Sequence, residues 1–427
     1  MILSAEDDIA DIIMCVVPWF TKGEWEPTKY AISVFSSQEV PGLQSADVAP
    51  TRYLPPNMYM DLPLQTTEFL DAGPHFRDDK GPSVKGAHDK VDKYDRQLRS
   101  RIRSCLSPGL ASFFERPVPL ADGKTEYRVW WDCKSTPLAI MPWETIIAET
   151  DSVRLYFVRG APPSDPSPTV PFHDQLKLAV IGQPLDSIWP KKLWEPLRQE
   201  GLQIDEFPGE GSAGLALRKA VAEDYDLIHL VASGITNTND DGLIYLGGDP
   251  EQRLEGYQLR SMFKSSRVAA LAFSFPGDMR SGIRQFKEAS TSYQAFATIA
   301  NMPEAGPSIV TQLRRSNMGT LIDFWRAYYA QLMASGHIVR AVDVARRAVV
   351  HREPGQDPAM ALFLNHRTGH LYERIESQDD ASDEQDQFES YVTGNIEAQL
   401  DESYFAENVG SAIKRSLEQA RSDGDER

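Results

Sequence analysis

The sequence has few cysteines, no long apolar run and fewer basic than acidic residues. Its three cysteines (Cys15, Cys105 and Cys133) are widely spaced among 427 residues, which excludes a cysteine-based zinc site and indicates no disulfide framework. No stretch approaches the roughly 20 apolar residues that a membrane-spanning helix needs. The formal net charge of −18 repels phosphate groups, so we expect neither nucleic-acid nor membrane binding.

The first twenty residues lack the basic start of a secretory signal. They read MILSAEDDIADIIMCVVPWF, with acids where a signal has bases and a short apolar stretch that ends at Pro-Trp. Together with the scarcity of cysteine, this favours a reducing compartment, and we expect a cytoplasmic protein. The sequence indicates no cofactor and leaves the oligomeric state open.

Composition is that of a globular protein with ample material for a large core, at 41% hydrophobic and 25% charged residues. Three zones follow one another along the chain. Residues 1–90 combine one clear strand, at 29–36, with Pro-, Gly- and Asp-rich stretches, and we expect a strand and loop-rich extension. Residues 91–375 form the main domain, and residues 376–427 an acidic tail.

The main domain alternates apolar strands with amphipathic helices. This rhythm predicts an α/β fold, an α/β/α sandwich in which a mostly parallel sheet is flanked by helices on both faces. Two helices close the domain, at 320–336 and 338–350, each with an apolar face suited to core packing. The predicted strands are 126–131, 152–160, 176–182, 202–207, 226–231 and 268–275.

The tail holds fifteen acidic and four basic residues, a net charge of −11. Within it Phe405, Val409, Ile413 and Leu417 are spaced to share one helical face, so we expect a partly helical tail that docks or binds a partner. A solvated, disordered tail is the equally supported alternative.

Residues 209–214 read GEGSAG, a literal match to the glycine pattern of dinucleotide-binding loops. Such a loop needs its glycines directly after an apolar strand and an acidic residue at the end of the next strand. Here Pro208 intervenes and the next strand ends in VASG, so an ordinary helix entry with Ser212 as N-cap is favoured. A nucleotide-binding regulator remains an alternative function.

Residues 365–370 read NHRTGH and offer His366 and His370 as metal ligands. A structural or catalytic metal site needs at least a third ligand, and none lies nearby in sequence. A surface turn is therefore the favoured interpretation, and we expect no metal.

The order of many short motifs along this sequence is similar to that in a known family. Across residues 90–375, the chain resembles the CHAT domain, a caspase-like peptidase family related to separases. Pro142, Trp143 and Glu144 of the first motif are similar to a strand-turn of that family. The motifs are PLAIMPWETII, LKLAVIGQP, YDLIHLVASG, DDGLIYLG, LEGYQLRSMFKSSRVAALAFSF, AFATIANMPEAGPSIVTQLRR and FWRAYYAQLMASGHIVRAVDVARRAVV.

The resemblance implies where catalytic residues belong and shows that they are missing. In the family a His-Gly follows the strand that matches IHLVASG, and a catalytic Cys ends the strand that matches ALAFSF. These positions are Ser233 and Ser274 here, while Gly234 keeps the glycine. No cysteine follows Cys133, so the thiol mechanism is excluded by residue content.

Residue His229 lies four positions before Ser233 on the same predicted strand, roughly 13 Å away at about 3.3 Å per residue. We therefore expect His229 to be a polar residue satisfied within the sheet rather than a base for Ser233. The crevice between the two strand ends, with His229, Gly234, Ser274 and Phe275, is the expected binding site for a peptide or a partner's loop.

These features predict a catalytically inactive CHAT-like protein. It is expected to be a binding, scaffold or regulatory module in a protease-based signalling or defence system, with a protein partner such as an active protease. The alternative enzyme is a peptidase that uses Ser274 with a base supplied from elsewhere.

Overall fold

The computed structural model describes residues 9–19, 29–36, 100, 103, 106, 108–119, 125–133, 143–146, 153–163, 170–171, 176–182, 189–207, 213–223, 225–231, 234–236, 243–245, 253–263, 266–274, 306–312, 318–350, 360–366 and 368–373. The chain divides into two compact units, Met1–Arg374 and Ile375–Arg427. All described residues belong to the first unit. The predicted acidic tail at 376–427, and the loop-rich stretch from 37 to 90, lie outside them.

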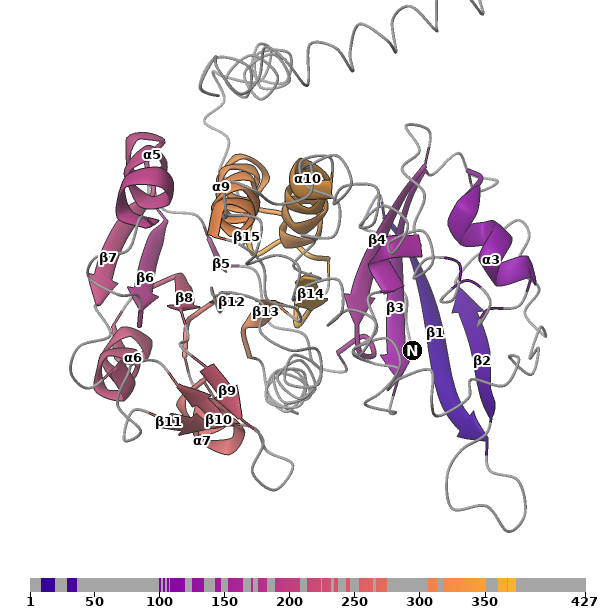
Figure 1. The fold of residues 1–427 in the computed structure, drawn as a ribbon, viewed down its shortest axis with the longest axis horizontal. Helices are drawn as coiled ribbons and strands as arrows, with labels where there is room; N and C mark the ends of the chain where they lie inside the picture. The colour runs from indigo at the N-terminus through magenta and orange to yellow at the C-terminus, as the bar shows by residue number, and fades with distance from the viewer. Residues whose placement is uncertain are drawn as a thin grey trace, which may run out of the picture. The chain divides into compact units, whose positions relative to one another are not determined.

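A ten-stranded sheet organises the first unit (Figure 1). Seven of its nine neighbouring pairs are parallel, and only β2 with β1 and β14 with β13 are antiparallel. The predicted α/β fold with a mostly parallel sheet is therefore confirmed. In spatial order the strands are β2 (Lys29–Ser36), β1 (Ala10–Trp19), β3 (Glu126–Cys133), β4 (Arg154–Arg159), β14 (Met360–Phe363), β13 (Ser308–Gln312), β12 (Ala270–Ser274), β8 (Leu227–Val231), β6 (Lys177–Ile181) and β7 (Gln203–Phe207).

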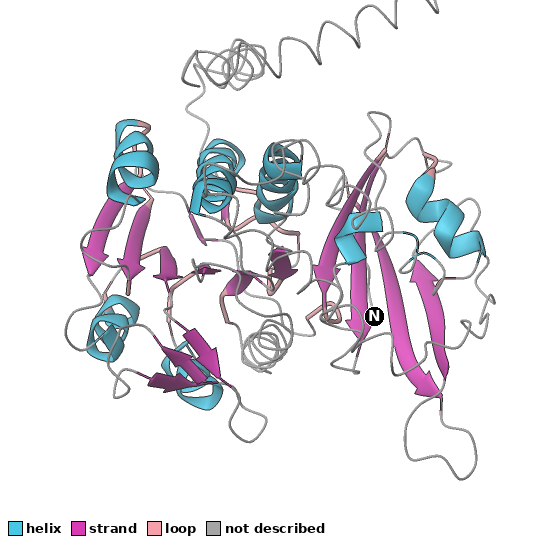
Figure 2. Cartoon of the chain, viewed as in Figure 1, coloured by secondary structure: helices cyan, strands magenta, loops and turns pink. Residues whose placement is uncertain are grey.

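Helices cover both faces of this sheet, as the strand patterns predict (Figure 2). One apolar cluster joins the sheet to α3 (Pro108–Glu115), the 3-10 turn η2 (Trp143–Ile146), α6 (Ala213–Ala222) and α7 (Gly256–Phe263). The cluster on the other face includes the π-helical turn η3 (Pro190–Trp194), α5 (Glu195–Gln199), α9 (Met318–Ser335) and α10 (Ile338–Val350). Central strands such as β8 and β12 are buried along their whole length, which explains their continuous apolar sequences.

Two small sheets accompany the large one. The first is antiparallel and contains β9 (Gly234–Thr236), β10 (Leu243–Tyr245) and β11 (Arg253–Glu255). The second is a parallel pair of β5 (Val170–Pro171) and β15 (Tyr372–Glu373). Among the described residues, no helix is long and apolar enough to cross a membrane.

The N-terminal zone contributes more to the fold than its sequence indicates. The predicted strand at 29–36 is present as β2, but its partner β1 falls in the apolar stretch considered above only as a signal segment. Strand β1 pairs with β3 in parallel, so this part of residues 1–90 adds two strands to the main sheet. Strand β14 was not predicted either, because MALF is too short to show a period.

Candidate functional site

Strands β8 and β12 are parallel neighbours, and they bring His229 and Ser274 together. His229 pairs in register with Ala272, two residues before Ser274, so both side chains project from the same face of the sheet. The distance between His229 Nε2 and Ser274 Oγ is 2.8 Å. Ser274 therefore has an imidazole within hydrogen-bonding distance.

The second ring nitrogen of His229 is held by helix α9. Tyr329 places its hydroxyl 2.8 Å from His229 Nδ1. Both hydroxyls can donate or accept a hydrogen bond, so the two hydrogen bonds form with either tautomer of a neutral imidazole. Residues Ser274, His229 and Tyr329 thus form one buried chain of two hydrogen bonds, called the buried triad below.

The buried triad lies inside an aromatic cage. The His229 ring centroid is 5.5 Å from that of Trp189, 5.4 Å from Trp194 and 4.5 Å from Trp325. Neither His229 nor Ser274 has any exposed surface, and Tyr329 is 1% exposed. Burial lowers the pKa of His229 to about 3 and raises the pKa of Tyr329 well above its ordinary value of 10.

This geometry has the connectivity of a catalytic triad but not its electrostatics. A general base must carry a proton and a positive charge during the reaction, and in serine hydrolases a carboxylate stabilises that charge. Here a neutral phenol occupies the third position. The drop in pKa to about 3 makes imidazolium formation roughly 5 kcal/mol harder than in water. The site therefore favours a fixed neutral network over proton transfer.

Access is the second obstacle to catalysis. A nucleophile must touch its substrate, and Ser274 is fully buried. The predicted binding site therefore needs a correction: the side chains of His229 and Ser274 lie in the core and present no surface to a peptide. Gly234 begins β9. Ser233 and Phe275 lie outside the described residues.

Sequence reasoning placed His229 correctly as a polar residue satisfied within the sheet but missed its partner. The spacing in sequence gives only the distance from His229 to Ser233 along one strand. The contact instead joins His229 to Ser274 on the neighbouring strand. A signal was present, because His229 and Ser274 are the only side chains with strong polar groups in two otherwise apolar strands. Two such residues in neighbouring buried strands must find partners inside the core.

The described residues of the NHRTGH segment are buried or half-buried, which corrects the interpretation of a surface turn. His366 is 1% exposed, and its Nδ1 lies 2.9 Å from Ser308 Oγ at the start of β13. His370 packs against His337 with ring centroids 4.5 Å apart. Burial explains the orientation of both rings, and within the described part of the chain no group of three or more potential ligands could hold a metal ion.

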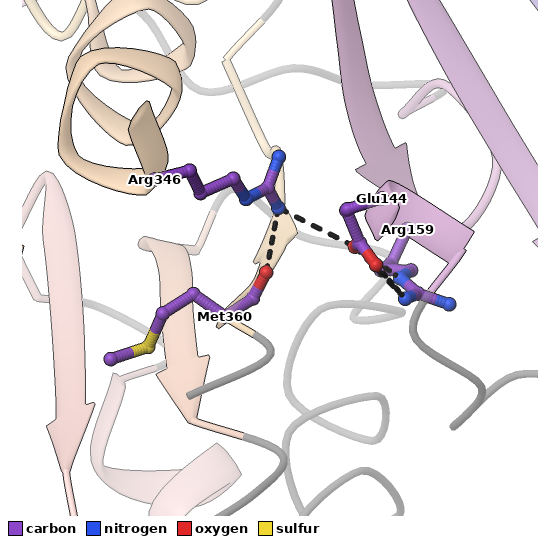
Figure 3. A network of polar contacts seen from close by, with 4 residues as sticks. All are labelled: Glu144, Arg159, Arg346 and Met360. Atoms are coloured by element: carbon purple, nitrogen blue, oxygen red, sulfur yellow. Dashed lines mark hydrogen bonds and ion pairs between the residues drawn. The ribbon is translucent and has the colours of Figure 1, made fainter. Parts of the chain in front are cut away.

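Glu144, from the motif that resembles the CHAT strand-turn, lies in a network of charges (Figure 3). Its carboxylate binds Arg159 at 2.6 Å and Arg346 at 3.4 Å, and Arg346 also donates to the Met360 carbonyl at 2.6 Å. Residue Arg159 has no exposed side-chain surface. The network joins η2, β4, α10 and β14, so the role of Glu144 in this structure is to connect elements.

The loop suspected of nucleotide binding lies mostly outside the described residues. Only its last two positions are described, as the start of α6 at Ala213. Nothing in the described geometry bears on the nucleotide hypothesis.

No protein-family model matches the chain, and no curated protein matches it significantly in sequence.

Proposed function

We propose that this chain is a CHAT-like, caspase-type domain without peptidase activity, which acts as a binding or regulatory module in a protease-based signalling or defence system. The single observation that supports the absence of catalytic activity is that the buried triad is not accessible to a substrate. Ser274 has no exposed surface, and its partner His229 is kept neutral by the aromatic cage. The mostly parallel sheet with helices on both faces supports the fold part of the proposal.

A serine hydrolase is the second candidate, because one observation favours it. The 2.8 Å contact between His229 Nε2 and Ser274 Oγ supplies the base that a serine nucleophile needs. In this form of the enzyme hypothesis the base comes from the neighbouring strand, not from a distant loop or another chain. It requires an opening of the aromatic cage that admits substrate.

A fluorophosphonate probe separates the two candidates, because it forms a stable bond with activated serines. We expect no labelling of the full-length folded chain at pH 7 to 8. Ser274→Ala and His229→Gln are the matched variants. Labelling of the native protein that both variants abolish would establish the hydrolase and refute the inactive module.

A further inference from the structure

His337 is a buried histidine that the buried triad does not use. It immediately precedes α10, and its side chain is completely buried. Its Nδ1 accepts a long hydrogen bond of 3.4 Å from the backbone N–H of Arg340, in the manner of a helix N-cap. The ring proton of the neutral imidazole therefore resides on Nε2, which is buried and has no hydrogen-bond partner among the described residues.

His337 belongs to a tight joint between two segments of the chain, Gly336–Ile338 and Gly369–Leu371. Two backbone hydrogen bonds connect them, from Ile338 N–H to the Gly369 carbonyl and from Leu371 N–H to the Gly336 carbonyl, both 2.9 Å long. The two segments are closely packed where Gly369 meets His337. A Cβ added at Gly369 would come within 2.7 Å of His337 Cε1.

Three groups that can carry positive charge act on the His337 ring. They are His370 of the joint, Arg340 of α10 and Arg128 of β3, and all three lower the pKa of His337. Asp11 of β1 binds Arg128 at 2.7 Å, and Glu126 of β3 binds Arg340 at 2.7 Å. No carboxylate is among the described groups that shift the pKa of His337.

Protonation of His337 therefore has three unfavourable consequences in the closed joint. It converts Nδ1 from an acceptor to a donor, which removes the cap on Arg340 N–H. It also places a positive charge at the N-terminus of α10, where the helix dipole is positive. Finally, it buries that charge beside other cationic groups. Burial first, and then these neighbours, lower the pKa of His337 to about 2.

We propose that the joint is an acid-sensitive latch, in which protonation of His337 separates the α9–α10 turn from segment 368–373. Segment 368–373 precedes the acidic residues 376–427 in sequence. This regulatory property is independent of the proposed binding function. It holds whether or not the chain has hydrolase activity.

Hydrogen exchange of the full-length protein tests the latch. If His337 in the open joint has the ordinary pKa of about 6.5, the opening equilibrium rises about 25-fold between pH 7 and pH 5. After correction for intrinsic exchange rates, peptides covering 336–340 and 368–373 should show this increase, and His337→Asn should remove it from those peptides. No increase in the wild-type peptides between pH 7 and pH 5 would overturn the proposal.

His337→Asn provides the matched variant. Asparagine caps helices well through its side-chain oxygen but does not titrate in this range, so the joint should stay closed and lose its pH dependence. His337→Gln serves the same purpose if the asparagine variant does not fold. His366→Asn removes a different buried histidine and should leave the response of the joint unchanged. A response that persists in the His337 variants would refute the latch.

Discussion

Tyr328 and Tyr329 are adjacent on α9 and both are buried, but their hydroxyls have opposite surroundings. The Tyr329 hydroxyl binds His229 Nδ1 at 2.8 Å. The Tyr328 hydroxyl has no hydrogen-bond partner in the structure, and burial raises the pKa of both phenols above their ordinary value of 10. The pair thus allows a satisfied and an unsatisfied hydroxyl to be compared at neighbouring positions on one helix.

Removal of the two hydroxyls should affect stability differently. Tyr329→Phe leaves His229 Nδ1 buried without a partner, and we expect the free energy of unfolding to fall by about 1–3 kcal/mol. Tyr328→Phe removes a hydroxyl that makes no hydrogen bond, so its effect should be close to zero or stabilising. Urea denaturation of both variants measures the difference.

Equal losses in the two variants would contradict this account of the buried triad. The result would mean that the 2.8 Å contact between Tyr329 and His229 contributes no net stability.

At the scale of elements, the arginines of α10 contact η2 and two strands, β14 and β3. Arg346 bridges Glu144 of η2 and the Met360 carbonyl of β14, while Arg340 binds Glu126 of β3. Helix α10 is therefore apolar toward α9 and the core and charged toward these strands. The helical spacing of its apolar residues predicts the apolar face, but the partners of its arginines are visible only in the fold.

Glu144→Gln tests how much the charged network holds these elements together. The change leaves Arg159, which has no exposed side-chain surface, without its carboxylate. Removing one partner of a buried ion pair typically destabilises a protein by about 3–5 kcal/mol, and we expect a loss in that range from thermal or urea unfolding. Figure 3 shows the groups involved.

Lys219 on α6 and Glu223 just after it provide the control, because both are exposed and their charged atoms are 3.6 Å apart. Glu223→Gln should change stability by less than about 0.5 kcal/mol, as is usual for exposed helix pairs. If both substitutions had similarly small effects, the network would not be what joins η2, β4 and α10.

At the scale of the whole molecule, buried neutral histidines make the fold sensitive to acid. Burial lowers the pKa of His229 to about 3 and that of His366 to about 4. The unfolded chain binds a proton at each near pH 6.5, so their contribution to stability is complete above that pH and declines as the pH falls toward the folded-state values. Acid should therefore weaken the fold before most carboxylates titrate.

We expect protonation of His229 and of His366 each to lower the free energy of unfolding by up to about 2 kcal/mol between pH 7 and pH 5. His366→Asn should accordingly show a smaller fall in the free energy of unfolding over this range than the wild type. Urea titrations at the two pH values measure both falls. Identical pH dependence in variant and wild type would show that His366 titrates normally in the folded protein.

The sequence by itself determined the kinds of element and the limits of the chemistry. Strands such as β6 and β8 follow from short continuous apolar runs, and helix α10 follows from a period of 3.6 residues, which are local properties of the chain. The absence of cysteine after Cys133 likewise excludes a thiol at Ser274 without any structure.

Only the tertiary structure decided which elements are neighbours. The pairing of β1 with β3, the antiparallel step from β13 to β14, and the contact of His229 with Ser274 join residues between 45 and more than 100 positions apart. Local periodicity carries no information about such partners, because many strand orders bury the same apolar faces. The cage that makes His229 a neutral core residue is assembled from two segments on either side of it in sequence, 189–194 and α9, and so its chemistry could be known only from the fold.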